Sequence, residues 1–331
     1  MATLYITEQG AIVRRVDERI IVEHEKEVLA DIPLIKVDQV VLFGRVGLTT
    51  PVIETLLEEG VEVCFLNQWG RFLGRLQPAQ GKNCLVRADQ FRASFDADRA
   101  TYLARQFVKG KLKNMLNLLM RARREGVNLP EEPFLEINQA IKALPRAENV
   151  DGVRGLEGAG SAAYFRVFGK LLKKDFQFHG RVRRPPTDPV NSLLSFAYTL
   201  LAKDTASAVN TVGLDPYTGF LHKDRYGRVS LALDIAEEFR PIVADAVVLS
   251  VINRGMIGRD DFEQELGGAV KLKDDARKRF LAAYEKKKQS EIRHPYFKYR
   301  ATYRRCMELQ ARLLAKYLQG EIDKYLPLVT R

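Results

Sequence analysis

The sequence is poor in the residues that build disulfide frameworks and thiolate metal sites. Its 331 residues include three cysteines, which stand apart at Cys64, Cys84 and Cys306 without any CxxC pair. Disulfide-stapled folds and zinc ribbons need closely spaced cysteine pairs, so this pattern argues against both classes. Scattered cysteines are typical of a protein that works in a reducing compartment, and we expect a cytoplasmic location.

Long apolar runs are absent as well. A membrane-spanning helix needs roughly 18 or more consecutive apolar residues, and no stretch of the sequence provides them. The opening residues, MATLYITEQG, lack the apolar core of a secretory leader. We therefore expect no membrane segment and no export signal.

Several common catalytic and nucleotide-binding motifs are also missing. The sequence contains no HExxH, no GxSxG and no His-Asp dipeptide, so the usual signatures of zinc proteases and serine hydrolases are not there. The stretch GLEGAGSAA follows no strand pattern and has the wrong glycine spacing for a dinucleotide-binding fold. The stretch GRLQPAQGKN likewise has the wrong spacing for a P-loop.

Positive charge is present in excess, but only in one part of the chain. Residues 1–80 hold 8 Lys and Arg against 12 Asp and Glu, whereas residues 81–331 hold 45 against 30. The net charge of +11 therefore comes entirely from the second part. A basic surplus confined to one region favours a polyanionic partner, of which DNA and RNA are the commonest.

Residues 1–76 are predicted to form a β-rich N-terminal domain, because short segments rich in β-branched residues alternate there with turn signals. The predicted strands are LYIT, AIVRRV, RIIVEH, QVVLFG and VEVCFLN. One helix interrupts them, with Thr50 as its N-cap, Pro51 at its first position and Gly60 after its end. The polar stretch QPAQGKN, residues 77–83, is the predicted linker.

From Cys84 onward the apolar residues recur with helical periodicity, so residues 84–331 are predicted to form a larger, basic, all-helical domain. One long helix over 98–124 carries an apolar stripe of Leu103, Phe107, Leu112, Met115 and Leu119. Further helices are expected near 133–144, 152–174, 189–203, 231–252, 274–289 and 299–319. Pro241 should kink or split the helix that contains it. The segment 256–273 fits no pattern. The predicted fold class is α+β with two domains.

The stretch GFLHKDRYGRVSLALDIAEEFRP places His222, one of four histidines, before a helix that bears acids. Asp234 and Glu237 are three residues apart, so both project from one face of that helix. Carboxylates beside apolar neighbours are costly to bury unless a cation or hydrogen-bond donors satisfy them. The nearest candidate partners in the sequence are His222, Arg225 and Arg228.

A second stretch, VDGVRGLEGAGSAAYFRVFGKLL, places Glu157 beside an apolar helical stripe. Gly155, Gly158 and Gly160 accompany it, and each glycine costs a helix roughly 1 kcal/mol relative to alanine. Such a cluster suggests that another backbone or a ligand approaches this helix closely.

Oxygen ligands with a single imidazole suit Mg²⁺ or Mn²⁺ better than zinc. Glu157, His222, and Asp234 or Glu237 would form such a set. A divalent ion there could activate a hydroxyl nucleophile and neutralise charge that develops on a phosphodiester. Other interpretations stay open: the acids are a solvated helix face, the histidine is structural, and the glycines mark tight helix packing.

Together these stretches resemble the CRISPR-associated spacer-acquisition integrase/endonuclease family, which inserts new spacers into CRISPR arrays. The segments that carry the resemblance are RGLEGAGSAAYF, RPPTDPVNSLLSFAYTLL, GLDPYTGFLH and GRVSLALDIAEEFRP, in the order of the family. The resemblance covers essentially the whole chain. It implies a β-rich N-terminal domain for dimerisation and partner contact, followed by a helical catalytic domain.

The resemblance also implies roles for individual residues. Glu157, His222 and Glu237 fall on the three metal-ligand positions, for Mg²⁺ or Mn²⁺, and Asp234 matches a further acid that activity needs. Some members of the family have Asp at the position of Glu237.

Further residues near these motifs are candidates for contact with DNA. Tyr164 and Tyr217 match motif positions. The candidates for binding DNA phosphates are three basic residues beside the histidine, Lys223, Arg225 and Arg228.

The function implied is a metal-dependent DNA integrase and endonuclease. It would join the 3′-hydroxyl ends of short DNA duplexes to the CRISPR repeat by transesterification, and water in place of the hydroxyl would give DNA cleavage. The family implies a homodimer that forms a heterohexamer with a small ferredoxin-like CRISPR-associated protein and carries double-stranded DNA. The alternative is a non-enzymatic basic nucleic-acid-binding protein. A sequence-specific regulator is disfavoured, because no helix-turn-helix unit stands out.

Overall fold

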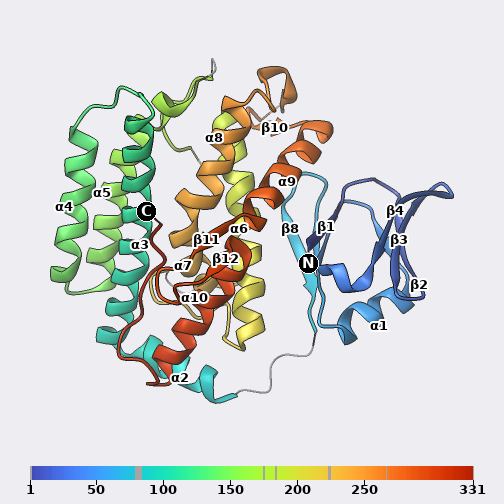
Figure 1. The fold of residues 1–331 in the computed structure, drawn as a ribbon, viewed down its shortest axis with the longest axis horizontal. Coiled ribbons are helices and arrows are strands. Elements are labelled where there is room, and N and C mark those ends of the chain that lie inside the picture. The colour runs from blue at the N-terminus through green and yellow to red at the C-terminus, as the bar shows by residue number, and fades with distance from the viewer. Residues whose placement is uncertain are drawn as a thin grey trace. The chain divides into compact units, whose positions relative to one another are not determined.

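The computed structural model describes residues 2–78, 84–173, 176–182, 185–222, 225–265 and 267–330. The chain forms two compact units, which Figure 1 shows as a ribbon. The β unit comprises Met1–Gln80 with Lys271–Glu285, and the helical unit comprises Gly81–Val270 with Lys286–Arg331. Most of the predicted linker over 77–83 lies outside the described residues. The α+β class predicted from the sequence is confirmed.

The β unit contains two four-stranded sheets. In the first, the strand order is β1-β5-β7-β8, with the first three parallel and β8 antiparallel to β7. In the second, the order is β4-β3-β2-β6. The strands are β1 (Ala2–Ile6), β2 (Ile12–Val16), β3 (Arg19–His24), β4 (Glu27–Pro33), β5 (Val37–Phe43), β6 (Gly47–Leu48), β7 (Glu62–Leu66) and β8 (Phe72–Leu76).

The core of the β unit consists of branched aliphatic side chains from both sheets and from helix α1 (Thr50–Glu58). Strand β5 is buried on both faces, which explains its continuous apolar run. The segment 271–285 belongs to this unit through contacts such as Arg277, which donates to the carbonyl of Gln68, and Glu285, whose Oε1 lies 3.4 Å from the Thr3 amide. Helix α9 (Asp274–Gln289) begins in this unit and ends in the helical one.

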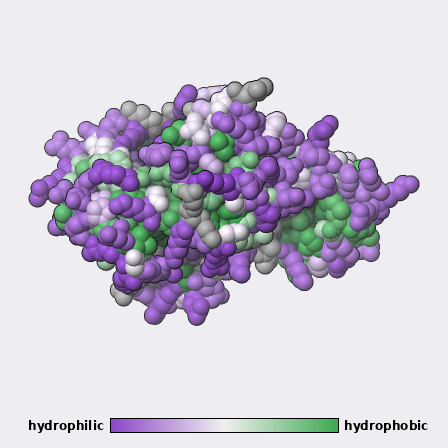
Figure 2. All heavy atoms as spheres, turned by 90° about the horizontal axis from the view of Figure 1, so that it is seen from above, coloured by the Kyte–Doolittle hydropathy of each residue, from purple (hydrophilic) through white to green (hydrophobic). Residues whose placement is uncertain are grey.

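The β unit also exposes several large apolar side chains, and Figure 2 shows hydrophobic surface on it beside the hydrophilic atoms that cover much of the visible face. These residues are Ile12, Val16, Val28, Leu29, Ile35, Trp69, Phe72 and Leu73. Apolar residues gathered on a surface are typical of a protein-contact face.

The helical unit is organised around helix α3 (Ala97–Arg124), which packs against its neighbours α2, α4, α5 and α7. The five residues of its predicted apolar stripe are all fully buried. The other helices are α2 (Cys84–Phe95), α4 (Glu132–Ala143), α5 (Val150–Phe168), α6 (Pro189–Val212), α7 (Ser230–Phe239), α8 (Ala246–Asn253) and α10 (Tyr303–Leu318). None of the helices in the described ranges is both long enough and apolar enough to span a membrane.

Pro241 splits the helix predicted over 231–252, as expected. The chain leaves α7, forms a π-helical turn over Arg240–Asp245, and continues as α8. A proline cannot donate the helical hydrogen bond, and a π turn accommodates that loss within an otherwise continuous helix. The turn changes the directions in which Arg240 and Asp245 project.

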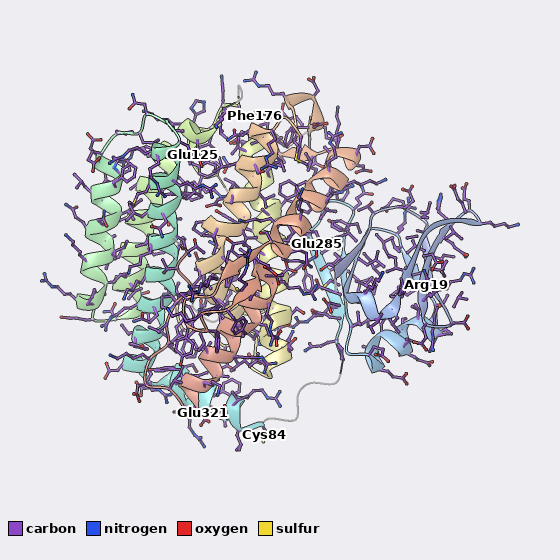
Figure 3. The ribbon with its side chains drawn as sticks, in the orientation of Figure 1. Arg19, Cys84, Glu125, Phe176, Glu285 and Glu321 are labelled. Carbon is purple, nitrogen blue, oxygen red and sulfur yellow. The ribbon has the colours of Figure 1, made fainter. Side chains whose placement is uncertain are left out.

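Some elements were not predicted. Strands β4, β6 and β8 and helix α2 were missed, and two short hairpins interrupt the region predicted to be all-helical. They are β9 (Phe262–Gln264) with β10 (Val270–Leu272), and β11 (Glu291–Arg293) with β12 (Arg300–Thr302). The first of these hairpins lies in the unassigned segment 256–273. Cys84 is exposed at the start of α2 (Figure 3), while Cys64 and Cys306 are buried.

Candidate active site

Helix α7 carries three acids, and none of them is a solvated surface residue. Asp234, Glu237 and Glu238 are 0%, 2% and 0% exposed. The interpretation of a solvated helix face is therefore wrong for this helix. Three buried carboxylates in ten residues are stable only if each one has donors or cations around it.

Asp234 holds the loop that carries His222. Its carboxylate accepts hydrogen bonds from the amides of Phe220, Leu221 and His222 at 2.6, 2.9 and 3.0 Å. It also contacts Nδ1 of the His222 ring at 2.6 Å. Because the carboxylate is an acceptor, this contact selects the imidazole tautomer that carries its proton on Nδ1 and leaves a lone pair on Nε2.

Gly219 allows this loop to approach α7 closely. A Cβ atom at this position would lie 2.8 Å from both Asp234 Oδ2 and Ser230 Cβ, closer than real Cβ contacts. Glycine is therefore required where the loop crosses the start of the helix. The result is that Nε2 of His222 faces Glu237, at 3.7 Å from its Oε1.

Glu157 of α5 and Glu237 of α7 meet at the side chain of Lys111 from α3. The Lys111 ammonium forms an ion pair with Glu157 and lies 2.8 Å from Glu237 Oε2. Arg240, in the π turn, lies 2.9 Å from Glu237 Oε1. Ser161 donates to Glu157 at 2.9 Å. Four elements of the helical unit thus converge on two carboxylates.

The cations around these acids keep them ionised. Burial is the largest influence on Glu237 and by itself raises its pKa, but the charges of Arg240 and then Lys111 lead the opposing influences, and the pKa falls from 4.5 to about 2. For Glu157, burial again raises the pKa most, and the negative charge of Glu237 adds to this. The charge of Lys111 leads the opposing influences, and the resulting pKa is below its ordinary value. Both groups are therefore carboxylates at neutral pH.

Glu157, His222 and Glu237 line one pocket of about 350 Å³, together with Arg154, Leu221 and Arg228. Arg154 is held in place by the carbonyl of Leu221 at 2.7 Å and by Asp151 at 2.6 Å. A pocket that combines carboxylates, an imidazole and guanidinium groups has partners for both a cation and a phosphate.

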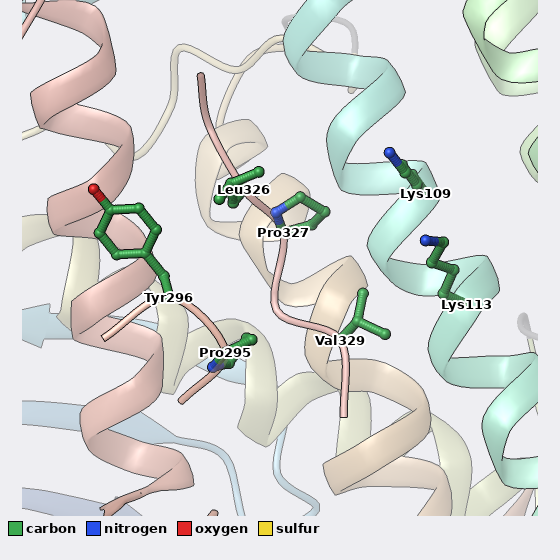
Figure 4. A pocket seen from close by; sticks show the side chains of 7 residues that line it. All are labelled: Lys109, Lys113, Pro295, Tyr296, Leu326, Pro327 and Val329. Carbon is green, nitrogen blue, oxygen red and sulfur yellow. The ribbon is translucent and has the colours of Figure 1, made fainter. Parts of the chain in front are cut away.

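A second pocket, of about 220 Å³, is shown in Figure 4. It lies between α3, the residues before the C-terminus and the turn after β11. The residues that line it are Lys109, Lys113, Pro295, Tyr296, Leu326, Pro327 and Val329. Because this lining contains no carboxylate, imidazole or thiol, the pocket lacks the usual side-chain ligands of a metal ion.

The glycines of α5 have different surroundings. A Cβ on Gly160 would lie 2.5 Å from a methyl group of Leu112 on α3, so this glycine permits close helix packing. Gly155 and Gly158 have no described neighbour within 4 Å of such an atom. A close approach by another element is therefore found at Gly160 only, and the approach of a ligand to Gly155 and Gly158 stays a prediction.

The residues predicted to contact DNA have different locations. Tyr164 is fully buried and donates to Asp245 at 3.0 Å, so it has no surface to offer DNA. Arg228 lines the pocket, while Arg225 is exposed and Tyr217 is 47% exposed. Lys223 lies outside the described residues.

Three functional candidates were missed in the sequence: Lys111, Arg154 and Arg240. A signal existed for Lys111, because it stands between Phe107 and Met115 at helical spacing, in the middle of the apolar stripe. A lysine at a core-facing position needs an acidic partner.

In the described ranges, no three His, Cys, Asp or Glu side chains lie close enough together to hold a metal ion in their present positions. The reason is visible at Lys111, whose ammonium lies between the two carboxylates. Oε2 of Glu237 is buried and accepts no hydrogen bond of good geometry from the described residues. Its environment is that of an oxygen paired with a cation.

Comparison with known proteins identifies the family of the chain. The family model described as CRISPR associated protein Cas1 matches residues 4–286. The chain is 42% identical over 337 residues to CRISPR-associated endonuclease Cas1 1 of Chlorobaculum tepidum, covering 99% of this chain and 98% of that protein.

Solved structures share the fold. The chain resembles a protein of a Cas6-RT-Cas1–Cas2 complex with a TM-score of 0.81 and 25% identity, over 98% of this chain and 36% of that one. It resembles a casposase bound to integration product with a TM-score of 0.86 and 24% identity, over 98% of this chain and 93% of that one. At this identity the second likeness is one of fold. The chain belongs to the Cas1 family of CRISPR-associated proteins.

Proposed function

We propose that the chain is a metal-dependent DNA integrase and endonuclease of CRISPR adaptation, with its active site in the pocket of Glu157, His222 and Glu237. The observation that carries this proposal is the convergence of these residues, from three separate parts of the chain, on one pocket that also contains arginines. A non-enzymatic DNA-binding protein has no use for two buried carboxylates and an imidazole with a free lone pair.

The donor set fits Mg²⁺ or Mn²⁺. Two carboxylates and one imidazole nitrogen are the ligands that Mn²⁺ accepts readily and Mg²⁺ tolerates. The Lys111 ammonium already marks a place where a cation is stable between Glu157 and Glu237. When bound, the ion would polarise the scissile phosphate and would help the attacking hydroxyl or water to lose its proton.

The side chains around the ion have separate roles. Glu157, His222 and Glu237 hold the ion, and Asp234 orients the imidazole through Nδ1. Arg154 and Arg228 neutralise a DNA phosphate that enters the pocket. A 3′-hydroxyl that attacks the phosphodiester would form a new P–O bond while the P–O bond within the attacked strand breaks, and the displaced oxygen would leave as a hydroxyl. Water in the same place would cleave the strand.

The proposed partners follow from the relatives. Some are solved as Cas1–Cas2 complexes, so we propose that a homodimer of this chain assembles with a small ferredoxin-like partner into a heterohexamer on double-stranded DNA. The exposed apolar residues of the β unit supply a surface for such contacts. A protein with this proposed function would act in the cytoplasm.

The test offers the protein a short duplex with free 3′ ends and a supercoiled plasmid that carries a repeat, with and without the partner and with Mg²⁺, Mn²⁺ or a chelator. We expect joined and cleaved products that need the ion and vanish in Glu157→Ala. The matched control is Glu148→Ala, an exposed acid just before α5. Full joining by Glu157→Ala would refute the site.

A further inference from the structure

Lys111 contacts two carboxylates that line the pocket and is the least expected residue of the site. Its side chain is 3% exposed, and it occupies a core-facing position of α3 between Phe107 and Met115. Moving an ammonium group out of water costs several kcal/mol unless it is paired. Its partners are Glu157 and Glu237, which are the two carboxylates assigned to the metal.

The ammonium occupies the position that a metal ion would need. A single Nζ atom contacts oxygen atoms of both carboxylates, and the contact to Glu237 is 2.8 Å. A divalent ion bound to the same oxygens would lie about 2.1 Å from each. Two cations so close to one pair of oxygens would repel each other strongly, because the site is buried and poorly screened.

We propose that Lys111 is an internal counter-ion, which holds Glu157 and Glu237 together until a divalent cation takes its place. This inference rests on the proposed metal site and adds how that site is kept intact before the ion arrives. The four-carbon stem of lysine lets the ammonium withdraw by several ångströms while α3 stays in place.

Two consequences follow from the charges. Without metal, Lys111 balances one buried and one half-buried carboxylate that would otherwise repel each other, so the metal-free protein keeps its fold. With metal, the ion must displace the ammonium, so the measured affinity is lower than that of the carboxylates and imidazole alone. Arg240 does not replace Lys111, because Arg240 pairs with the other oxygen of Glu237, Oε1.

The first experiment compares the wild type with Lys111→Met, which keeps the length and the apolar stem. Mn²⁺ binding is measured by calorimetry or electron paramagnetic resonance on DNA-free protein. We expect binding tighter by roughly tenfold or more, because a competing charge is removed. We also expect a lower unfolding midpoint in chelator and a larger rise on adding Mn²⁺. Lys113→Met, a half-buried lysine of the same helix outside this pocket, is the control.

The second experiment uses the wild type alone, so it stands even if the Met variant fails to fold. An amine-reactive reagent is applied in chelator and in saturating Mn²⁺, and modified lysines are counted by mass spectrometry. Modification of Lys111 should rise severalfold with Mn²⁺, while that of Lys113 stays constant.

The possible outcomes distinguish a failure of the proposed metal site from a failure of the proposed counter-ion role of Lys111. If the wild type binds no Mn²⁺, the metal site itself is refuted. If the wild type binds Mn²⁺ but Lys111→Met binds it equally or more weakly, the counter-ion role is refuted and the metal site stands. If Lys111 remains unreactive towards the reagent in Mn²⁺, displacement of its ammonium by the ion is refuted as well.

Discussion

Two neighbouring glutamates of α7 face two different regions of the helical unit. Glu237 faces the pocket, and Glu238 faces the residues before the C-terminus. Both are buried, at 2% and 0% exposure. The pKa of Glu237 is lowered to about 2, whereas burial, the largest influence on Glu238, raises its pKa to about 8.

The difference comes from what surrounds each carboxylate. Glu237 has the cations Lys111 and Arg240 beside it. Glu238 has neutral donors, which are the Gln310 amide at 2.8 Å, the Tyr325 hydroxyl at 2.6 Å and the Leu328 amide at 2.7 Å. These hydrogen bonds lower its pKa, but less than burial raises it. Burial alone therefore does not mark a functional acid, since the neighbouring charges decide which proton state it keeps.

The Glu238 side of α7 is structural. Asn114 of α3 donates to the carbonyls of Glu238 and Leu328, both at 2.8 Å, and accepts from the Thr330 amide at 3.0 Å. The residues before the C-terminus are thereby fastened along α3 and α7. One short helix thus presents a charged site to one side and a neutral hydrogen-bond network to the other.

The sharpest test of this comparison exchanges each glutamate for glutamine. Glu237→Gln removes a proposed metal ligand, and we expect cleavage and joining to fall on the order of 10³-fold. Glu238→Gln keeps the shape of a group that is largely protonated in the fold, so its activity should stay within a few-fold of wild type. Rates are measured on the same duplex and plasmid. Equal losses in both variants would remove the distinction between the two sides.

Asp234→Asn tests whether the third acid of α7 acts through His222. An amide cannot accept all the hydrogen bonds that now fix the loop and the imidazole, so we expect Mn²⁺ affinity and activity to fall by about 10–100-fold. Binding of DNA in chelator should be unchanged, which separates a positioning role from misfolding. Wild-type metal affinity in this variant would show that Asp234 does not orient the ring.

Gly110→Ala tests the packing around Glu238, on the structural side of α7. A Cβ there would lie 2.9 Å from Pro327 and 3.0 Å from Glu238, so we expect a loss of about 1–3 kcal/mol in unfolding free energy. Gly155→Ala is the matched control, because it faces open space within a helix and should stabilise the fold by roughly 0.5–1 kcal/mol. Urea denaturation in chelator measures both. A neutral Gly110→Ala would mean that the C-terminal residues are not held against α3.

The smallest expected effect is a pH dependence of stability. Because folding raises the pKa of Glu238 from 4.5 to about 8, its contribution is complete below pH 4.5 and declines as the pH rises through about 8. For Glu237 the sign is opposite, with a contribution complete above pH 4.5 and lost as the pH falls towards 2.

Denaturation curves between pH 5 and 9, recorded in chelator, check this sign. Glu238→Gln cannot titrate, so its stability relative to wild type should improve from pH 5 to about 8 and then level off. A constant difference between the two proteins would contradict the raised pKa.

Much of the fold could be predicted where local pattern and burial agree. The stripe of α3 and the split at Pro241 are such cases, because periodicity and the missing proline N–H act locally. Strand β4 was missed because its hairpin turn uses Glu25 and Lys26, both with positive φ, in place of the usual Asn or Gly. The β9–β10 and β11–β12 hairpins are too short to leave a period in the sequence.

For the site, the sequence by itself determined which side chains could do chemistry and that Asp234 and Glu237 share a helix face. Helical spacing decides directions on one helix, but it says nothing of what another helix places opposite them. Only the tertiary structure decided that Lys111 from α3 meets Glu157 and Glu237, that Asp234 holds His222, and that Glu238 belongs to a separate network. The reason is physical: the charge state of a buried acid depends on neighbours in space, and those neighbours come from distant parts of the chain.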